Sequence, residues 1–227
     1  MQIISFNVLL RYYEETYKTN SKYLKRFPIE EERVEETIDF LLKLCKSGAI
    51  ICLQECSKQF MNTMRKKSGE DYTFYSEIVD NNPEENLITL IPKRYGKFVK
   101  VDTENKLDGI ASGILVLSNS RCVIANCHLV PQKYCKRDVD VLGAVNEEFA
   151  CSLPTIVAGD FNAMYDKVSK VFGEKFNVPF FCNTYHRTQL DYILISKNSN
   201  YDFYKKTVAY NDFSDHNLIK LEVCKYT

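Results

Sequence analysis

The sequence predicts an α/β fold in which a predominantly antiparallel pair of sheets carries helices on its outer faces. Short apolar, β-branched runs that end in polar residues outnumber the helical patterns. Most neighbouring runs are separated by short turn-like segments, which favours antiparallel pairing over a strict alternation of strands and helices. The 227 residues are 45% hydrophobic and 13% aromatic, enough for a sizeable core. We therefore expect one domain over residues 1–227.

Composition narrows the class of protein. The 30 Lys and Arg residues balance the 30 Asp and Glu residues, so the whole chain has no electrostatic preference for nucleic acid. No apolar run approaches the ~20 residues needed to cross a bilayer, so we expect no membrane association. The first ten residues lack the basic flank of a secretory signal. The nine cysteines are odd in number and lack a CxxC pair, which indicates reduced thiols and no paired zinc ligands. We expect a cytoplasmic protein, with the nucleus left open, that is not secreted.

In the first half of the chain, a strand is predicted over residues 2–8, followed by a polar, Tyr-rich excursion over residues 11–27. Apolar residues at helical spacing predict a helix from Ile29 to Gly48, with three glutamates in its first turn. Residues 49–53 form an apolar strand ending at Gln54 and Glu55.

The remaining elements are assigned in the same way, by period and turn signals. Ser57 can cap a helix that runs to Lys67. The segment DNNPEEN, residues 80–86, is read as a turn. We expect further strands at residues 72–79, 86–92, 97–101, 110–117, 121–130, 154–158, 189–196 and 217–223, and helices at residues 132–152 and 166–172.

Asp160 and Asn162 follow a short apolar strand in the segment PTIVAGDFNA. A carboxylate and an amide held at the end of a strand suit a hard cation or a phosphate. Asp and Asn at such a place are also ordinary turn formers that bond their own backbone. The choice depends on whether other polar residues interrupt apolar strand ends.

Several other polar residues interrupt the ends of apolar strands, and they come from distant parts of the chain. Each has an ordinary interpretation as a strand terminus, a solvated acid or a buried histidine. Two of the only three histidines fall at such places, however, which makes independent coincidences a poor explanation for the whole set. The set consists of Asn7, Glu55, His128, Asp191, Asp215 and His216.

The segments SFNVL, CLQE, ANCHL, GDFNA, LDYILIS and SDHNLI, in this order, resemble the endonuclease/exonuclease/phosphatase superfamily, to which pancreatic deoxyribonuclease belongs. The resemblance spans nearly the whole chain, and its combination of motifs is specific. It implies a four-layer α/β sandwich of two packed mixed sheets, and it implies Mg²⁺-dependent hydrolysis of a phosphoester, with Mn²⁺ as a substitute.

The resemblance also implies roles for these residues. Glu55 matches the principal metal ligand, Asn7 the amide near the metal, and Asp215 an acid beside it. Mg²⁺ does prefer such oxygen ligands. Asn162 and Asp160 match the pair that orients the attacking water and the phosphate.

The two histidines complete the implied site. His128 matches the residue that contacts the scissile phosphate, and Asp191 matches the acid that supports the catalytic His216. An Asp–His pair fixes the imidazole tautomer and favours its protonated form. Either Asp160 or His216 could polarise the attacking water, and the sequence leaves both open.

The substrate is less well defined than the reaction. The FNVLL and LDYILIS segments look most like the deadenylase and nocturnin branch. We therefore expect a monomer that acts on nucleic acid or a nucleotide, RNA before DNA, as an RNA 3′-exonuclease or a 2′,5′-oligoadenylate phosphodiesterase. His186 lies in a polar segment, where it could contact substrate or sit in a surface loop.

Other functions remain open. A DNA-repair nuclease acting on abasic sites or 5′-tyrosyl DNA fits the same motifs, although the absence of Trp departs from the abasic-site enzymes. A phosphatase acting on a soluble or lipid phosphoester is a further enzyme class. The alternative without catalysis is a degenerate domain that binds a partner.

Overall fold

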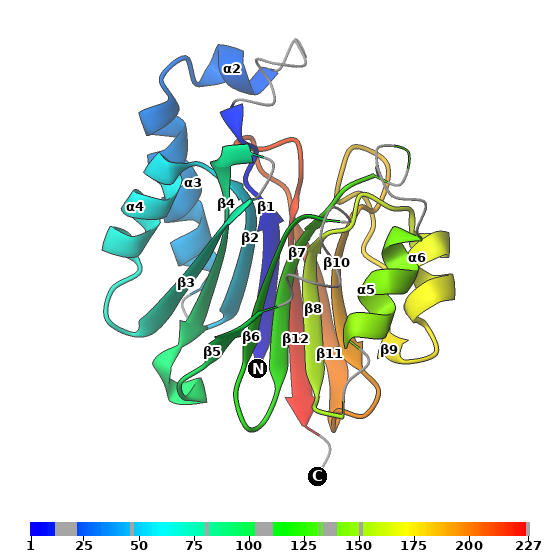
Figure 1. The fold of residues 1–227 in the computed structure, drawn as a ribbon. Helices are drawn as coiled ribbons and strands as arrows, with labels where there is room; N and C mark the ends of the chain where they lie inside the picture. Colours follow the sequence, from blue (N-terminus) through cyan, green and yellow to red (C-terminus); the bar gives the residue numbers. More distant parts are fainter. Residues whose placement is uncertain are drawn as a thin grey trace.

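The protein is a sandwich of four layers, in which two six-stranded sheets pack face to face between two pairs of helices (Figure 1). The computed structural model describes residues 1–11, 22–45, 48–79, 82–102, 111–131, 133, 140–149 and 152–225. This architecture confirms the four-layer α/β sandwich implied by the sequence motifs.

The first sheet has the strand order β11-β12-β1-β2-β4-β3. Its central pair, β1 and β2, is parallel, and its other pairs are antiparallel. The strands are β1 (Gln2–Asn7), β2 (Ile50–Cys56), β3 (Tyr72–Val79), β4 (Asn82–Pro92), β11 (Tyr201–Ala209) and β12 (Leu218–Lys225).

The second sheet has the order β5-β6-β7-β8-β10-β9 and repeats this design. Its parallel pair is β7 and β8, again with antiparallel strands on either side. The strands are β5 (Val99–Val101), β6 (Ala111–Ser118), β7 (Val123–Leu129), β8 (Thr155–Asp160), β9 (Phe176–Asn177) and β10 (Asp191–Ser196).

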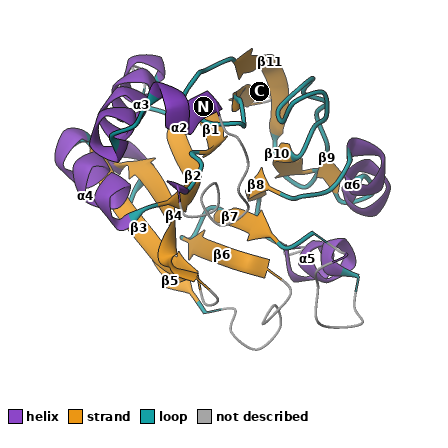
Figure 2. Ribbon diagram, turned by 90° about the horizontal axis from the view of Figure 1, so that it is seen from above, coloured by secondary structure: helices purple, strands orange, loops and turns teal. Residues whose placement is uncertain are grey.

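Helices cover the outer face of each sheet. Helices α3 (Glu30–Leu44) and α4 (Lys58–Lys67) lie on the first sheet, and α5 (Val141–Phe149) and α6 (Tyr165–Phe172) lie on the second, as the view from above shows (Figure 2). Ser57 caps α4 as predicted, because its Oγ accepts the N–H of Phe60. The short helix α2 (Lys22–Arg26) and the 3₁₀ turn η1 (Lys93–Tyr95) complete the described elements.

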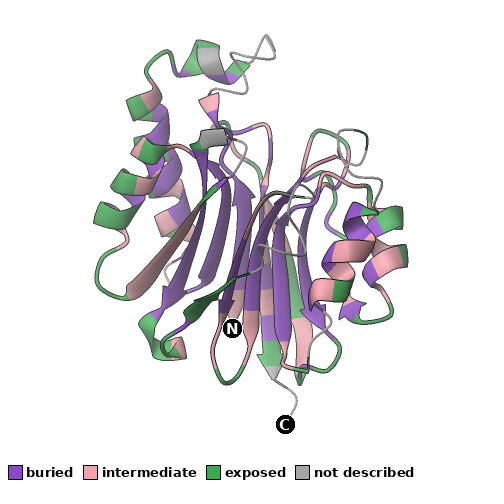
Figure 3. Ribbon diagram, viewed as in Figure 1, coloured by how far each residue is buried: buried purple, intermediate pink, exposed green. Residues whose placement is uncertain are grey.

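Three apolar clusters separate the four layers. Ile3 points between the sheets, whereas Ile4 points toward α3 and α4, and both side chains are fully buried. Val157, on the next sheet, faces α5 and α6. Strands buried on both faces read as continuous apolar runs, and the central strands are accordingly buried along most of their length (Figure 3).

The structure corrects several expectations. The segment read as a turn over residues 80–86 belongs largely to β4, which begins at Asn82, and β2 continues through Glu55 to Cys56. The polar excursion contains α2, although its residues 12–21 lie outside the described part. Strand β11 was not predicted, because its exposed edge carries consecutive polar residues with no apolar run. Of the helix expected over residues 132–152, the described part is α5 and is shorter.

Two further features bear on the class of protein. In the part of the chain that the structure describes, seven cysteines are free thiols: Cys45, Cys52, Cys56, Cys122, Cys127, Cys182 and Cys224. No helix in the described ranges combines the length and the apolarity that a membrane crossing requires.

Candidate active site

The predicted site residues gather at one end of the sandwich, where the parallel pair of each sheet ends. Asn7 and Glu55 lie at the carboxyl ends of β1 and β2, and His128 and Asp160 at those of β7 and β8. Parallel strands end at the same edge of a sheet. Because the two sheets are stacked, their four strand ends face one another across the sandwich.

Glu55 reaches the site through a bulge in β2. The pairing of β2 with β4 shifts register between Leu53 and Cys56, and Glu55 adopts a positive φ of 56°. Its Oε1 accepts the Nδ2–H of Asn7 at 2.7 Å, and its Oε2 accepts the backbone N–H of Leu10 at 2.9 Å. The carboxylate is therefore oriented by the end of the neighbouring strand.

Asn126 supports this bulge from the second sheet. Its Nδ2 donates to the carbonyl oxygens of Leu53 and Ile88 at 3.0 and 2.9 Å, and its Oδ1 accepts from Gln54 Nε2 at 2.7 Å. Irregular pairing leaves backbone groups without ladder partners, and buried carbonyls need a donor. A fully buried amide between the sheets supplies it.

Asp160 occupies the centre of the site. Its Oδ1 accepts the N–H of Asn162 at 2.8 Å, and its Oδ2 accepts from Asn7 Nδ2 at 3.2 Å. The same Oδ2 lies 3.9 Å from Nε2 of His128 and 3.7 Å from Nε2 of His216. Asn162 has a positive φ of 48°, and its Nδ2 donates to the carbonyl of Leu129 at 2.9 Å.

Asp191 and His216 form a buried pair beside Asp160. Asp191 begins β10 opposite Asp160, and its Oδ2 lies 3.0 Å from Nδ1 of His216. This contact turns Nε2 of His216 toward Asp160. Thr184 fixes the backbone at the start of β10, because its Oγ1 accepts the N–H groups of Leu190 and Asp191.

Glu85 is a member of the cluster that sequence reasoning missed. Its side chain is completely buried, and its Oε1 lies 2.6 Å from Nδ1 of His128. The residue was hidden in the segment read as a turn. The available signal was a pair of glutamates next to an apolar strand, and that pattern is more common in exposed turns.

Burial and mutual contact perturb the ionisation of these groups. Burial raises the pKa of Glu55 to about 7. The nearby charges of Glu85 and Asp215 raise this pKa further, whereas the charge of His128 lowers it. Burial disfavours the charged form of His128, but Glu85, Glu55 and Asp160 raise its pKa to about 10. Groups with strongly perturbed pKa values in contact with one another are typical of functional sites.

The pKa of His216 is raised in the same way as that of His128. Burial opposes the charged form of His216, but Asp191, Asp160 and Asp215 together raise its pKa well above the ordinary value. Burial also raises the pKa of Asp191, although the charge of His216 opposes that change. The site thus stacks carboxylates and imidazoles in alternation across the junction of the sheets.

The donor set fits a divalent cation. Ligand atoms of Glu55, His128 and Asp160 lie within 4.8 Å of one another, as do those of Asp160, Asp191 and His216. Asp215 stands close enough to Glu55 to raise the pKa of Glu55, and the buried Oδ1 of Asp215 has no hydrogen-bond partner among the described residues. Carboxylate oxygens held close together are ligands that Mg²⁺ prefers, and a buried carboxylate oxygen without a donor is satisfied by a cation or water.

His186 is placed differently from the other predicted residues. It is exposed, with a positive φ of 48°, in a tight hairpin closed by Tyr185 and Thr188. Its ring contacts that of Tyr185 at 4.4 Å, and Tyr185 in turn contacts His216 at 4.7 Å between ring centroids. His186 therefore lies at the rim, one aromatic ring away from the central cluster.

Comparisons with known proteins agree with this fold. No curated protein matches the chain in sequence. The family model described as "Endonuclease/Exonuclease/phosphatase family" matches residues 4–216, which include every predicted site residue.

Similar folds come from several organisms. A conserved protein of unknown function from Enterococcus faecalis has 16% identity and a TM-score of 0.69, with 100% of each chain covered. The human nocturnin catalytic domain with bound sulfate has 19% identity and a TM-score of 0.65, covering 100% of this chain and 93% of that one. ANGEL2, a 2′,3′-cyclic phosphatase, in complex with adenosine-2′,3′-vanadate has 13% identity and a TM-score of 0.64, covering 98% and 94%.

At these identities the structures show a shared fold, whereas the family model matches the sequence itself over most of its length. The motifs at the strand ends, the four-layer sandwich and this match agree. The chain belongs to the endonuclease/exonuclease/phosphatase family.

Proposed function

We propose that this chain is a single catalytic domain that hydrolyses a phosphodiester of RNA or of an oligonucleotide with the help of Mg²⁺. One observation carries the proposal. Six sequence segments separated by up to 209 positions bring their polar residues into one buried cluster, from Asn7 to His216. A degenerate binding domain would have no need to maintain a buried set of carboxylates and imidazoles at a cost in stability.

The metal would be held by Glu55, with Asn7 and Asp215 beside it. When bound, Mg²⁺ neutralises negative charge on the phosphate and helps to generate the nucleophile. Hydrolysis of a phosphoester is largely a matter of positioning and charge stabilisation. The residues around this position therefore need only to orient water and the phosphate and to move one proton.

Asp160 is the proposed proton acceptor. Its Oδ1 is held by the N–H of Asn162, and its Oδ2 points into the centre of the cluster between the two imidazoles. An attacking water that loses its proton to Asp160 would face a phosphate contacted by Nε2–H of His128 and His216 and by the amide of Asn162. Asp191 and Glu85 act through the histidines, because each lies against an Nδ1 atom and leaves Nε2 free to face the substrate.

RNA is the proposed substrate class. The sequence segments nearest to the deadenylase and nocturnin branch support it, and so does the bound adenosine derivative in the similar ANGEL2 structure. The balanced charge of the chain is better suited to a short single strand than to a long duplex. The proposed enzyme works as a monomer in the cytoplasm, with Mn²⁺ able to replace Mg²⁺.

A cleavage panel tests the proposal. The substrates are RNA with a 3′-poly(A) tail, RNA ending in a 2′,3′-cyclic phosphate, 2′,5′-linked oligoadenylate, abasic duplex DNA, 5′-tyrosyl DNA and an inositol polyphosphate. Each is incubated with Mg²⁺, Mn²⁺ or EDTA. Glu55→Gln is the inactive variant, and Glu84→Gln, at an exposed position near the site, is its control.

Stepwise shortening of RNA that disappears in EDTA and in Glu55→Gln, but persists in Glu84→Gln, is the expected result. Cleavage of a DNA or small phosphoester substrate alone would overturn the RNA assignment while keeping the reaction. Full activity of Glu55→Gln in Mg²⁺ would overturn the metal assignment.

A further inference from the structure

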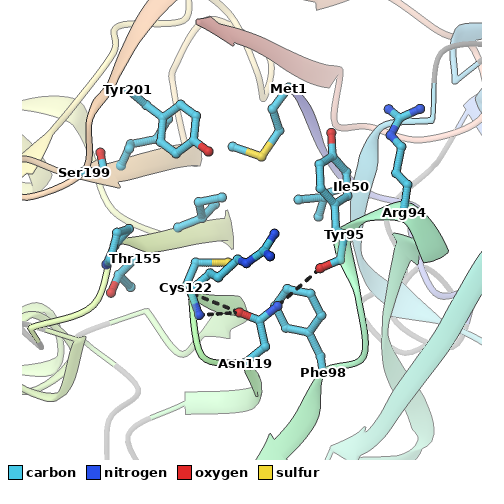
Figure 4. A pocket seen from close by; sticks show the side chains of 14 residues that line it. Met1, Ile50, Arg94, Tyr95, Phe98, Asn119, Cys122, Thr155, Ser199 and Tyr201 are labelled. Carbon is cyan, nitrogen blue, oxygen red and sulfur yellow. Dashed lines mark hydrogen bonds between the residues drawn. The ribbon is translucent and has the colours of Figure 1, made fainter. Parts of the chain in front are cut away.

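A second pocket opens at the end of the sandwich opposite the candidate active site. It has a volume of about 140 Å³ and lies between the two sheets (Figure 4). Ile50 and Thr155 line it at the starts of β2 and β8, while Glu55 and Asp160 lie five residues further along the same strands. At ~3.3 Å per residue the two sites are roughly 17 Å apart. We call this cavity the basal pocket.

The floor and walls of the basal pocket are largely apolar. Ile50, Ile156, Ile195 and Phe98 form part of the core between the sheets, yet each also lines the pocket. Figure 4 shows the rings of Tyr95 and Phe98 on one side and that of Tyr201 on the other. A cavity of similar volume lined by apolar side chains is large enough to take a six-carbon group.

The charge at the rim of the basal pocket is positive. Arg94 and Arg121 both line it and both are exposed, whereas none of the 14 described residues that line it is acidic. Arg94 donates to the carbonyl of Gly48 at 2.7 Å and lies over the ring of Tyr95. The two guanidinium groups therefore make the rim of the pocket cationic.

The turn that carries Arg121 is held in place. Oδ1 of Asn119 accepts the backbone N–H groups of Arg121 and Cys122 at 2.8 and 3.0 Å, and its Nδ2 donates to the carbonyl of Tyr95 at 3.4 Å. These bonds, drawn in Figure 4, tie the two arginine-bearing segments to each other. The two cations are thus presented from linked segments at the mouth of an apolar cavity.

We propose that the basal pocket is a binding site for a small amphipathic anion, a molecule with an apolar body of about six carbons and one carboxylate or phosphate group. The apolar body occupies the space between Ile50, Ile156 and Ile195, and the anionic group meets Arg94 and Arg121 at the rim. The site is independent of the proposed hydrolysis, because it shares no residue with the catalytic cluster.

Hexanoate is the probe, and the isoleucine δ1-methyl groups report on it by NMR. Titration should shift the signals of Ile50, Ile156 and Ile195 in a saturable manner, with a dissociation constant on the order of 1 mM. Ile4 and Ile88, on the other face of the first sheet, should not shift. Hexylammonium, which has the opposite charge on the same chain, should bind at least about fivefold more weakly.

Variants separate the apolar and the ionic contributions. Arg121→Gln should weaken hexanoate binding about threefold, and the double variant with Arg94→Gln about tenfold, while Arg65→Gln on α4 should leave it unchanged. Cys122→Phe places a ring into the pocket and should abolish the saturable shifts. Cys182→Phe, at an exposed position outside the pocket, is its control.

Each outcome decides a part of the proposal. Binding of hexylammonium with the affinity of hexanoate would overturn the anionic assignment. Absence of saturable shifts in the folded wild-type protein, or shifts that persist in a folded Cys122→Phe variant, would overturn the site itself.

Discussion

At the scale of single residues, the imidazole of His128 lies among three carboxylates. Glu85 lies against its Nδ1 at 2.6 Å, and Glu55 and Asp160 lie 3.8 and 3.9 Å from its Nε2. Three carboxylates around one imidazole favour the imidazolium despite burial. The neighbouring carboxylates therefore keep His128 protonated.

Removing the charge of Glu85 should lower the pKa of His128. In the metal-free Glu85→Gln variant we expect a fall of more than one unit from about 10, because the nearest carboxylate is lost. The measurement is an NMR titration, simplified by the presence of only three histidines. Glu84→Gln is the matched control, and an unchanged titration of His128 in Glu85→Gln would contradict the assignment.

Glu55 makes metal affinity depend on pH. Its pKa of about 7 means that below neutral pH the carboxyl of the metal-free protein carries a proton, which a cation must displace. Mg²⁺ affinity should therefore fall by up to about tenfold per pH unit below 7 and level off above it. Calorimetric titrations between about pH 5.5 and 8.5 check this. A constant affinity down to pH 5.5 would show that Glu55 is ionised throughout that range.

At the scale of elements, the close approach of β7 and β8 depends on a glycine. Gly159 has a φ of +147°, and a Cβ built on it would lie 1.8 Å from the carbonyl oxygen of Cys127. It directly precedes Asp160, whose register partner is His128. Any side chain at this position would push apart the two strands that carry these residues.

Gly159→Ala should accordingly destabilise the fold by about 3 kcal/mol or more and reduce activity. Gly69→Ala is the control, because Gly69 also has a positive φ but a Cβ at its position would meet no atom within 4 Å, so only the backbone cost of about 1 kcal/mol applies. Urea unfolding of both variants measures the difference. Equal losses would mean that β7 and β8 separate at little cost.

Arg33 on α3 connects two loops of the site. Its guanidinium donates to the carbonyls of Val8 and Leu9 at 2.7 Å each and to that of Phe213 at 2.9 Å. These segments flank Leu10, which holds Glu55, and Ser214, whose Oγ donates to the carbonyl of Asn7. One buried side chain thus fixes both the end of β1 and the loop before His216.

Arg33→Lys should cost about 1–3 kcal/mol of stability, since a single ammonium cannot reproduce a planar fork of donors. It should also lower turnover, because the loops that orient Glu55 and His216 lose their common anchor. Urea unfolding and cleavage kinetics test both effects, with the exposed Arg65→Lys as the control. Unchanged stability and turnover would remove Arg33 from the set of positioning residues.

At the scale of the whole molecule, carboxylates from both sheets meet at one end of the sandwich. Glu55 and Glu85 come from the first sheet, and Asp160 and Asp191 come from the second. Like charges at close range oppose the packing of the two sheets. A cation bound among them would both complete the site and join the sheets.

Mg²⁺ should therefore stabilise the wild-type protein and raise its thermal midpoint. At a hundredfold excess of Mg²⁺ over its dissociation constant, the gain in free energy of unfolding is about 2.7 kcal/mol. In EDTA, Glu55→Gln should be more stable than the wild type, because a buried charge is removed, and Mg²⁺ should stabilise it much less. Thermal unfolding followed by circular dichroism gives the midpoints of both proteins, each measured with Mg²⁺ and with EDTA. Equal stabilisation of both proteins by Mg²⁺ would place the cation away from Glu55.

Much of this architecture was predictable from local sequence. The periods of α3 and α4, the cap at Ser57 and the apolar runs of the central strands define their elements, because burial on both faces or on one helical face leaves a strong pattern. The motif residues from Asn7 to His216 were also predicted as one set. Whether each has its proposed role stays a prediction until the variants are measured.

What the sequence alone determined is which polar residues form the candidate site and which strands they end, because polar residues at the ends of apolar strands are a local signal. Only the tertiary structure decided that Glu85 lies against His128, that Arg33 joins two loops, and that β11 completes a sheet. Each of these depends on contacts between segments distant in sequence, where a buried glutamate, a buried arginine and an exposed edge strand leave no period to detect. Proximity between segments that are distant in sequence decides where these residues and this strand lie.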